Sequence, residues 1–228
     1  MASEPALRAV LFDIDGTLVD SNYLHIDAWD RAFSDAGAPV DVWKIHRSIG
    51  MDSKKLLEAL VGDVDQDVQD KAKELHETYY KDSATRLRSF GGAQDVAREL
   101  AGRGFKVVFA TSAPEDELEI LRGVLEVDDA VAEMTSSGDV GTAKPDPDII
   151  ESALGKAGVD ASEAVMVGDA TWDMEAAGRA GVVGIGVLSG GNSAADLKAA
   201  GAVEVYDDVA DLLANLDSSI IGRRAPGQ

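Results

Sequence analysis

Short apolar runs alternate with amphipathic helical segments along most of the chain. The first run, residues 8–12, is apolar and ends at a cluster of turn-forming residues, which predicts a buried strand. Because helices separate the strands in this pattern, we expect right-handed βαβ units and a parallel sheet covered by helices on both faces. Similar runs predict five further strands, at residues 106–110, 130–134, 164–168, 182–187 and 203–205.

Residues from about 21 to 88 interrupt this alternation, since they carry helical periods and no strand pattern. Ser21 can cap a first helix that Gly37 ends, and further helical patterns cover residues 53–61 and 64–79. The sequence therefore predicts a helical subdomain in residues 21–88, inserted into an α/β core formed by residues 1–20 and 89–228.

Two segments of the core have clear local sequence signals. Asp146 and Pro147 supply an N-cap and a first-turn proline for a helix that Gly158 ends. The last residues, 223–228, have the composition of a disordered tail.

The composition is that of a globular protein, with 45% apolar and 28% charged residues and no cysteine. Lys and Arg number 21 and Asp and Glu 42, and the net charge of −21 disfavours nucleic acid and anionic membranes as partners. The N-terminus lacks a secretory pattern and no apolar stretch could span a bilayer. We therefore expect a cytoplasmic protein without a nucleic-acid or membrane partner.

Two carboxylates follow the first predicted strand directly, in the segment Asp13-Ile-Asp15-Gly-Thr. Ligands of open α/β sheets bind beyond the carboxyl ends of the strands, and the spacing of two residues lets both side chains face one crevice. Carboxylates this close would repel each other unless a metal or a proton intervened. A polar turn is the alternative interpretation. An EF-hand loop is excluded because Leu18 and Leu24 occupy positions that require Gly and Glu.

Three further segments place complementary chemistry at the ends of predicted elements. Thr111 and Ser112 end the second strand with hydroxyl groups that can donate to an anion. Lys144 precedes a helix N-terminus, where anions are stabilised. Asp169 follows another strand, and Asp173 lies about one helical turn further on. Each residue also has a structural interpretation, as a capping threonine, a surface lysine or an N-cap aspartate.

Together these motifs resemble the haloacid dehalogenase-like hydrolase superfamily. The matching segments are Asp13-Ile-Asp15-Gly-Thr-Leu-Val-Asp, Thr111, Lys144-Pro and Gly168-Asp169-Ala-Thr-Trp-Asp173, in family order across nearly the whole chain. The resemblance implies a Rossmann-like parallel sheet core, and the inserted helices look like the mobile cap of that family.

The resemblance also implies a role for each residue. Asp13 would be the nucleophile and Asp15 the general acid and base, with Thr111 and Lys144 holding the phosphate and the nucleophile. Mg²⁺ would bind Asp13, the Asp15 carbonyl and Asp169, with Asp173 supporting its waters. These roles are chemically consistent, because carboxylate attack on phosphorus forms an aspartyl-phosphate and Mg²⁺ prefers oxygen ligands.

The branch of the family is narrowed by residues near the motifs. The segment containing His25 resembles the cap-entry segment of β-phosphoglucomutases, where a histidine assists proton transfer; His25 could equally be a polar residue on a cap helix. Gly168 stands where those mutases carry Glu, and Ser53 stands near the position of their cap arginine. Residues 50–53 look more like the substrate loop of phosphoglycolate-type phosphatases.

The sequence therefore predicts a Mg²⁺-dependent phosphatase that hydrolyses a small phosphorylated metabolite. A phosphosugar mutase is the alternative, and a non-catalytic binding protein on the same fold is a third possibility.

Overall fold

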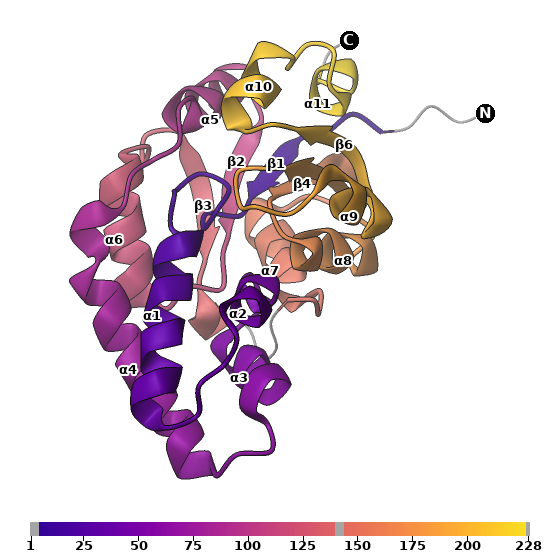
Figure 1. Cartoon of the computed structure of the whole chain (residues 1–228). Coiled ribbons are helices and arrows are strands. Elements are labelled where there is room, and N and C mark those ends of the chain that lie inside the picture. Colours follow the sequence, from indigo (N-terminus) through magenta and orange to yellow (C-terminus); the bar gives the residue numbers. More distant parts are fainter. Residues whose placement is uncertain (1–4, 140–143, 227–228) are drawn as a thin grey trace. The chain divides into compact units, whose positions relative to one another are not determined.

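The computed structural model describes residues 5–139 and 144–226. The chain divides into two compact units, one formed by Met1–Asp20 with Arg88–Gln228 and the other by Ser21–Leu87 (Figure 1). The first unit contains the sheet, and the second is helical.

The sheet of the first unit has six parallel strands in the order β3-β2-β1-β4-β5-β6. The strands are β1 (Ala9–Phe12), β2 (Lys106–Ala110), β3 (Val131–Thr135), β4 (Ala164–Gly168), β5 (Val183–Val187) and β6 (Ala202–Tyr206). The central strand β1 is buried along its whole length, as expected for a strand covered on both faces. The predicted α/β class with a parallel, Rossmann-like sheet is confirmed.

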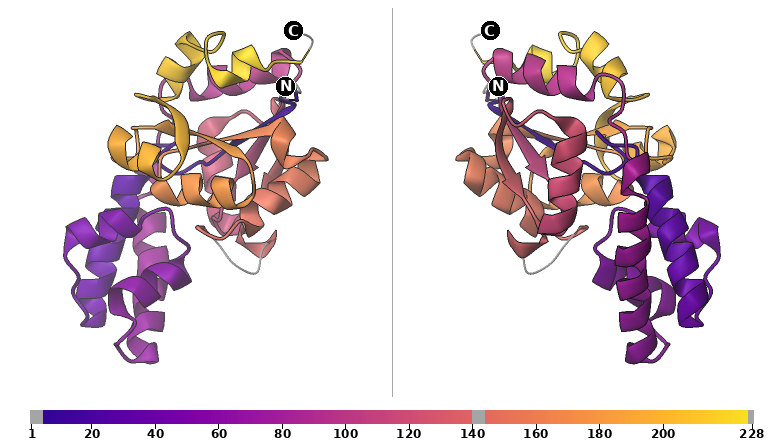
Figure 2. Two further views of the ribbon diagram at one scale, coloured as in Figure 1. Left: turned by 90° about the vertical axis from the view of Figure 1, so that its right-hand side faces the viewer. Right: turned by 90° about the vertical axis from the view of Figure 1, so that its left-hand side faces the viewer.

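Helices cover both faces of this sheet (Figure 2). They are α5 (Ala93–Gly102), α6 (Glu115–Leu125), α7 (Asp148–Ala157), α8 (Thr171–Arg179), α9 (Ala194–Ala199), α10 (Val209–Ala214) and α11 (Ile220–Arg223). On one face α7 packs Ile150 and Ala153 into a cluster with Ala9 and Leu11, alternate residues of β1. Figure 2 shows α5 and α10 on the opposite face.

The second unit contains four α-helices and a short 3-10 helix, Ala84–Arg86. The α-helices are α1 (Asn22–Ala36), α2 (Val42–Ser48), α3 (Ser53–Val61) and α4 (Gln66–Asp82). Its core includes Trp29 and Phe33 from α1, together with Ile45 from α2 and Leu56 from α3. The first helix ends at Gly37, which adopts a left-handed conformation with φ of 87° that glycine tolerates without strain.

Three local expectations need correction. Ser21 is the N-cap residue of α1, as predicted, but its side chain makes no capping hydrogen bond. Asp146 does not cap α7, because Pro147 occupies the N-cap position and Asp146 forms an ion pair with Arg179 at 3.4 Å. The tail predicted over residues 223–228 is ordered in its described part: Arg223 ends α11, and Arg224 donates to the carbonyls of Pro5 and Ser162. Residues 227 and 228 lie outside the described part of the chain.

Candidate active site

The residues predicted to carry the chemistry cluster at one edge of the sheet. Asp13 follows β1, Thr111 follows β2 and Asp169 follows β4, and these three strands are neighbours in the sheet. Because all three strands are parallel, their carboxyl ends meet at the same edge. Lys144 and Asp173 join this group from the segment before α7 and from the first turn of α8.

Lys144 lies between two carboxylates. Its Nζ donates to Asp13 Oδ1 at 2.7 Å and lies 2.7 Å from Asp173 Oδ1. The exposed fraction of the side chain is 2% for Lys144, 8% for Asp13 and 0% for Asp173. Asp173 Oδ2 also accepts the main-chain N–H of Ala170 at 3.0 Å, so Asp173 is held at the start of its own helix while it contacts the lysine.

A third carboxylate, that of Asp169, completes the cluster. Asp13, Asp169 and Asp173 each offer a carboxylate oxygen, and these oxygens lie within 4.8 Å of one another. All three residues are buried, and Thr17 Oγ1 donates to Asp169 Oδ1 at 3.0 Å. The carboxylate of Asp15 is not in this group, and the role of its carbonyl as a metal ligand stays a prediction.

The charge of the cluster fits a divalent cation. Three carboxyl groups share this buried site with the single ammonium of Lys144, so an arrangement with all three ionised would be costly unless a further cation compensated the excess negative charge. Mg²⁺ prefers oxygen ligands and accepts one or two carboxylates together with water and phosphate oxygens. The donor set therefore suits Mg²⁺.

The electrostatics of Asp13 and Lys144 follow from this arrangement. Burial raises the pKa of Asp13 to about 7, with help from Asp173 and Asp15 and against the opposing effect of Lys144. Burial alone would lower the pKa of Lys144, but the carboxylates of Asp13 and Asp173 outweigh it and raise that pKa above its ordinary value. Lys144 is therefore a permanent cation, whereas Asp13 needs further positive charge to stay ionised at neutral pH.

The two hydroxyl residues after β2 differ in their surroundings. Thr111 is buried, and its Oγ1 accepts the N–H of Ala113 at 3.1 Å. The Ser112 Oγ atom is buried and makes no hydrogen bond within the described part of the chain. Buried polar groups are nearly always paired, so this hydroxyl is suited to a phosphate oxygen of a substrate.

His25 belongs to the second unit, where it joins an aromatic cluster. Its Nδ1 lies 3.2 Å from His76 Nε2, and its ring stacks on Tyr80 with the centroids 3.8 Å apart. His76 in turn stacks on Trp29 at 4.0 Å. Burial, reinforced by His25, lowers the pKa of His76 well below its usual value. His25 thus helps to pack α1 against α4, and its role toward substrate stays a prediction.

Residues 50–53, predicted to contact substrate, form the turn that leads into α3 in the second unit. Gly50 has a φ of 92°, and Asp52 is the N-cap whose carboxylate accepts the N–H of Lys55 at 2.9 Å. This segment therefore has a local structural role, and its contact with substrate stays a prediction.

Three residues that were not predicted as part of the site support the turns that carry the carboxylates. Thr17 contacts Asp169 directly, and Asn192 Nδ2 donates to the main-chain carbonyl of Asp169 at 3.1 Å. Ser189 Oγ donates to the carbonyl of Gly16 at 2.7 Å. The available signal was a polar, glycine-rich loop that follows a predicted strand, in Ser189-Gly-Gly-Asn192.

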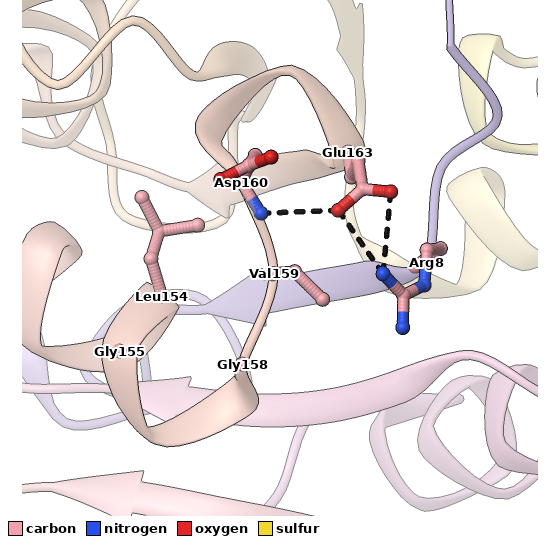
Figure 3. A pocket seen from close by; sticks show the side chains of 7 residues that line it. All are labelled: Arg8, Leu154, Gly155, Gly158, Val159, Asp160 and Glu163. Atoms are coloured by element: carbon pink, nitrogen blue, oxygen red, sulfur yellow. Dashed lines mark hydrogen bonds and ion pairs between the residues drawn. The ribbon is translucent and has the colours of Figure 1, made fainter.

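A surface pocket of about 340 Å³ lies away from this site (Figure 3). Its lining residues include Arg8, just before β1, and Glu163, just before β4, so it lies at the amino-terminal end of these strands. Arg8 and Glu163 form an ion pair with each other at 3.2 Å. The pocket therefore lies at the amino-terminal ends of these strands, whereas the carboxylates lie at their carboxyl ends.

Comparisons with known proteins identify the family of the chain. Residues 10–187 match the family described as haloacid dehalogenase-like hydrolase. The chain is 31% identical over 181 residues to a phosphoglycolate phosphatase of Rhodospirillum rubrum, covering 75% of each chain. A hydrolase of Pseudomonas syringae has a similar structure, with a TM-score of 0.88, 35% identity and coverage of 92% of this chain and 98% of the other.

A β-phosphoglucomutase-like protein of Bacteroides vulgatus shares the fold, with a TM-score of 0.87, 20% identity and coverage of 99% of this chain and 92% of the other.

The chain belongs to the haloacid dehalogenase-like hydrolase family. The predicted family and the predicted enzyme class, a hydrolase of the phosphatase type, are confirmed. Among the described residues, no helix is long and apolar enough to cross a membrane.

Proposed function

We propose that this protein is a Mg²⁺-dependent phosphatase that hydrolyses a small phosphorylated metabolite through an aspartyl-phosphate on Asp13. The observation that carries the proposal is the buried cluster in which Lys144 lies 2.7 Å from both Asp13 and Asp173, with an Asp169 oxygen within 4.8 Å of theirs. The cluster brings together the proposed nucleophile Asp13, the ammonium of Lys144 and the carboxylate oxygens that would bind a metal.

Asp13 and Asp169 would hold Mg²⁺, with the Asp15 carbonyl as a further ligand and Asp173 at the edge of the site. When bound, Mg²⁺ would compensate the excess negative charge and lower the pKa of Asp13, so that the carboxylate is ionised near neutral pH. This role matters for the proposed nucleophile, because burial raises the pKa of Asp13 to about 7 even with Lys144 beside it.

In the proposed reaction Asp13 attacks the phosphorus atom and the alcohol leaves. Asp15 donates a proton to the leaving oxygen and then takes one from the water that attacks the aspartyl-phosphate. Lys144 keeps the Asp13 carboxylate oriented through the 2.7 Å hydrogen bond. The hydroxyl of Ser112, buried and without a hydrogen bond to the described residues, and the hydroxyl of Thr111 would bind the phosphate oxygens.

The environment of Gly168 favours hydrolase over mutase. A Cβ at Gly168 would lie 2.4 Å from Asp173 Oδ2, so a larger residue at this position would displace Asp173 from Lys144. A Glu side chain at position 168, as expected for a mutase, and the side chain of Asp173 would therefore occupy the same space. This chain has Gly168 and Asp173 instead of that Glu.

The first experiment is a panel of small phosphoesters, scored for released phosphate with Mg²⁺ and with EDTA. Phosphate release that requires Mg²⁺ is expected for at least one ester. No release from any ester would favour a binding protein. Mass spectrometry of the intact Asp15→Asn protein after mixing with substrate should detect a phosphoryl adduct, and Asp13→Asn should show none. An adduct on Asp13→Asn would contradict the assignment of the nucleophile.

A second assay addresses the mutase directly. The enzyme is incubated with β-glucose 1-phosphate and a trace of the 1,6-bisphosphate, and both glucose 6-phosphate and free phosphate are measured. We expect free phosphate to be the faster product whenever the ester reacts. Glucose 6-phosphate that accumulates faster than phosphate would show that the chain belongs to the mutase branch.

A further inference from the structure

The loop between β5 and α9, residues 188–193, packs directly against Asp169. Asn192 Nδ2 donates to the main-chain carbonyl of Asp169 at 3.1 Å. A Cβ built on Gly190 would lie 1.6 Å from Asp169 Oδ2 and 2.3 Å from its Cγ. The loop therefore contacts both the main chain and the carboxylate of the residue proposed to hold the metal.

The absence of a side chain at Gly190 is a requirement of space. Gly190 is not among the glycines with positive φ, so an L-residue could adopt its backbone conformation. Its neighbour Gly191 does have a positive φ, 96°, in the turn that its N–H closes onto the carbonyl of Leu188 at 3.0 Å. Gly191 therefore shapes the turn, whereas Gly190 leaves room for the Asp169 carboxylate.

The same loop also holds the turn after β1. Ser189 Oγ donates to the carbonyl of Gly16 at 2.7 Å, one residue beyond Asp15. The next residue, Thr17, is fully buried and donates to Asp169 Oδ1 at 3.0 Å. The loop thus links the two turns that supply the proposed metal ligands: Ser189 contacts the turn after β1, and Asn192 contacts the turn after β4.

We propose that Ser189, Gly190 and Asn192 are positioning residues that set the affinity of this site for Mg²⁺. They hold the Asp169 carboxylate and the Gly16–Thr17 turn at a fixed separation, so that the ligands are in place before the ion binds. The inference rests on the proposed function, since it presupposes a metal at Asp169. Loss of such supporting contacts typically weakens metal affinity about 10- to 100-fold.

The test is calorimetric titration of the substrate-free, full-length enzyme with Mg²⁺. We expect the dissociation constant to rise about tenfold in Asn192→Ala and Ser189→Ala, and about 100-fold in Gly190→Ala, where the new methyl group displaces the carboxylate. Activity of the two milder variants should return at high Mg²⁺ concentration, with an unchanged KM for the phosphoester. Melting temperatures in EDTA establish that each variant is folded.

Matched controls come from the same chain. Asn215 Nδ2 donates to the carbonyl of Asp211 at 2.9 Å, the same type of bond as that of Asn192, so Asn215→Ala should leave Mg²⁺ affinity unchanged. A Cβ added at Gly123, in α6, would meet no atom of the described residues within 4 Å, and Gly123→Ala serves as the control for Gly190→Ala.

The outcomes separate the two proposals. If the wild-type enzyme binds Mg²⁺ and Asp169→Asn does not, the metal site is established, and equal affinity in wild type, Asn192→Ala and Gly190→Ala would then overturn the positioning role alone. If the wild-type enzyme does not bind Mg²⁺ and needs none for activity, the proposed function fails, and with it the inference. Weakened binding in the loop variants with unchanged controls supports the positioning role.

Discussion

Lys144→Met tests the electrostatic core of the site. Methionine is unbranched and apolar, so it occupies much of the volume of Lys144 and leaves Asp13 and Asp173 without the ammonium that lies 2.7 Å from each. Removal of one partner from a buried ion pair typically costs about 3–5 kcal/mol of unfolding free energy. Since about 1 kcal/mol corresponds to 2–4 °C in a chain of this size, the melting temperature at pH 8 in EDTA should fall by roughly 6–20 °C.

The loss of stability in Lys144→Met should become smaller as the pH falls. Lys144 lowers the pKa of Asp13, which burial raises to about 7 from an ordinary value of 3.8, so removing the lysine raises this pKa further. The folded variant then binds a proton that the unfolded chain has released. Its stability relative to wild type should therefore increase as the pH falls from 8 toward 7, by up to about 1.4 kcal/mol per pH unit, and change little below the wild-type pKa of about 7.

Two further variants isolate the cause. Lys144→Met combined with Asp173→Asn removes one of the two unpaired carboxylates and should regain part of the lost stability. Lys156→Met removes a lysine whose ion pair with Asp139, at 2.8 Å, is partly exposed, so its cost should stay below about 1 kcal/mol.

The assay is thermal unfolding followed by circular dichroism at pH 8, 7 and 6 in EDTA. A Lys144→Met protein that melts with wild type at pH 8 would refute the reasoning. So would a deficit of the same size at every pH, because it would reflect packing rather than charge.

Four other predictions concern catalysis and the second unit. Asp13→Asn should lower turnover of a phosphoester by at least ~10³-fold while its melting temperature in EDTA stays the same or rises, and near-normal turnover of the purified variant would contradict the nucleophile. EDTA should abolish phosphate release and Mg²⁺ should restore it, whereas Ca²⁺ should inhibit because its larger and looser coordination misplaces the phosphate; full activity in excess EDTA would exclude the metal. The neutral form of His76 is favoured in the fold, so the unfolded chain binds the extra proton and stability should be lost as the pH falls below 6.5. His76→Phe and His76→Gln should both remove that part of the pH dependence in urea unfolding at pH 7.5 and 5.5, and an unchanged dependence would refute it. His25→Ala should alter turnover about tenfold or less if the second unit only gates access, and a loss of ~10²-fold or more would instead indicate proton transfer by His25.

Most of the fold could be predicted because its signals are local. A strand lies at each of the six apolar runs. For central strands such as β1 and β4 the signal is strong, since a buried parallel strand is apolar along its length, whereas the edge strands β3 and β6 are partly exposed. The helix α2 was not predicted, because its seven residues are too few to establish a helical period. Its Ile45 is fully buried only through contact with the other helices of the second unit, which the local sequence does not encode.

The residues of the candidate site could also be predicted, because they are chemically distinctive residues at the ends of predicted strands. The ion pair between Lys144 and Asp173 was not predicted; the family resemblance placed Asp173 near the waters of the metal instead. This pair joins a loop to the first turn of a different helix, so it depends on the packing of α7 and α8 onto the same sheet. Neither residue's immediate sequence specifies the other as its partner.

The loop after β5 escaped prediction for a different reason. Ser, Gly and Asn are the ordinary residues of turns, so Ser189, Gly190 and Asn192 carry no chemical signature that separates a supporting loop from any other. Their contacts depend on the strand order, which places β5 beside β4 and therefore brings the loop after β5 next to Asp169. Two of these contacts, moreover, are made to main-chain carbonyls, which every residue possesses. A candidate carboxylate can thus be recognised from residue type and spacing, whereas the groups that hold it become recognisable only once the neighbours of its strand are known.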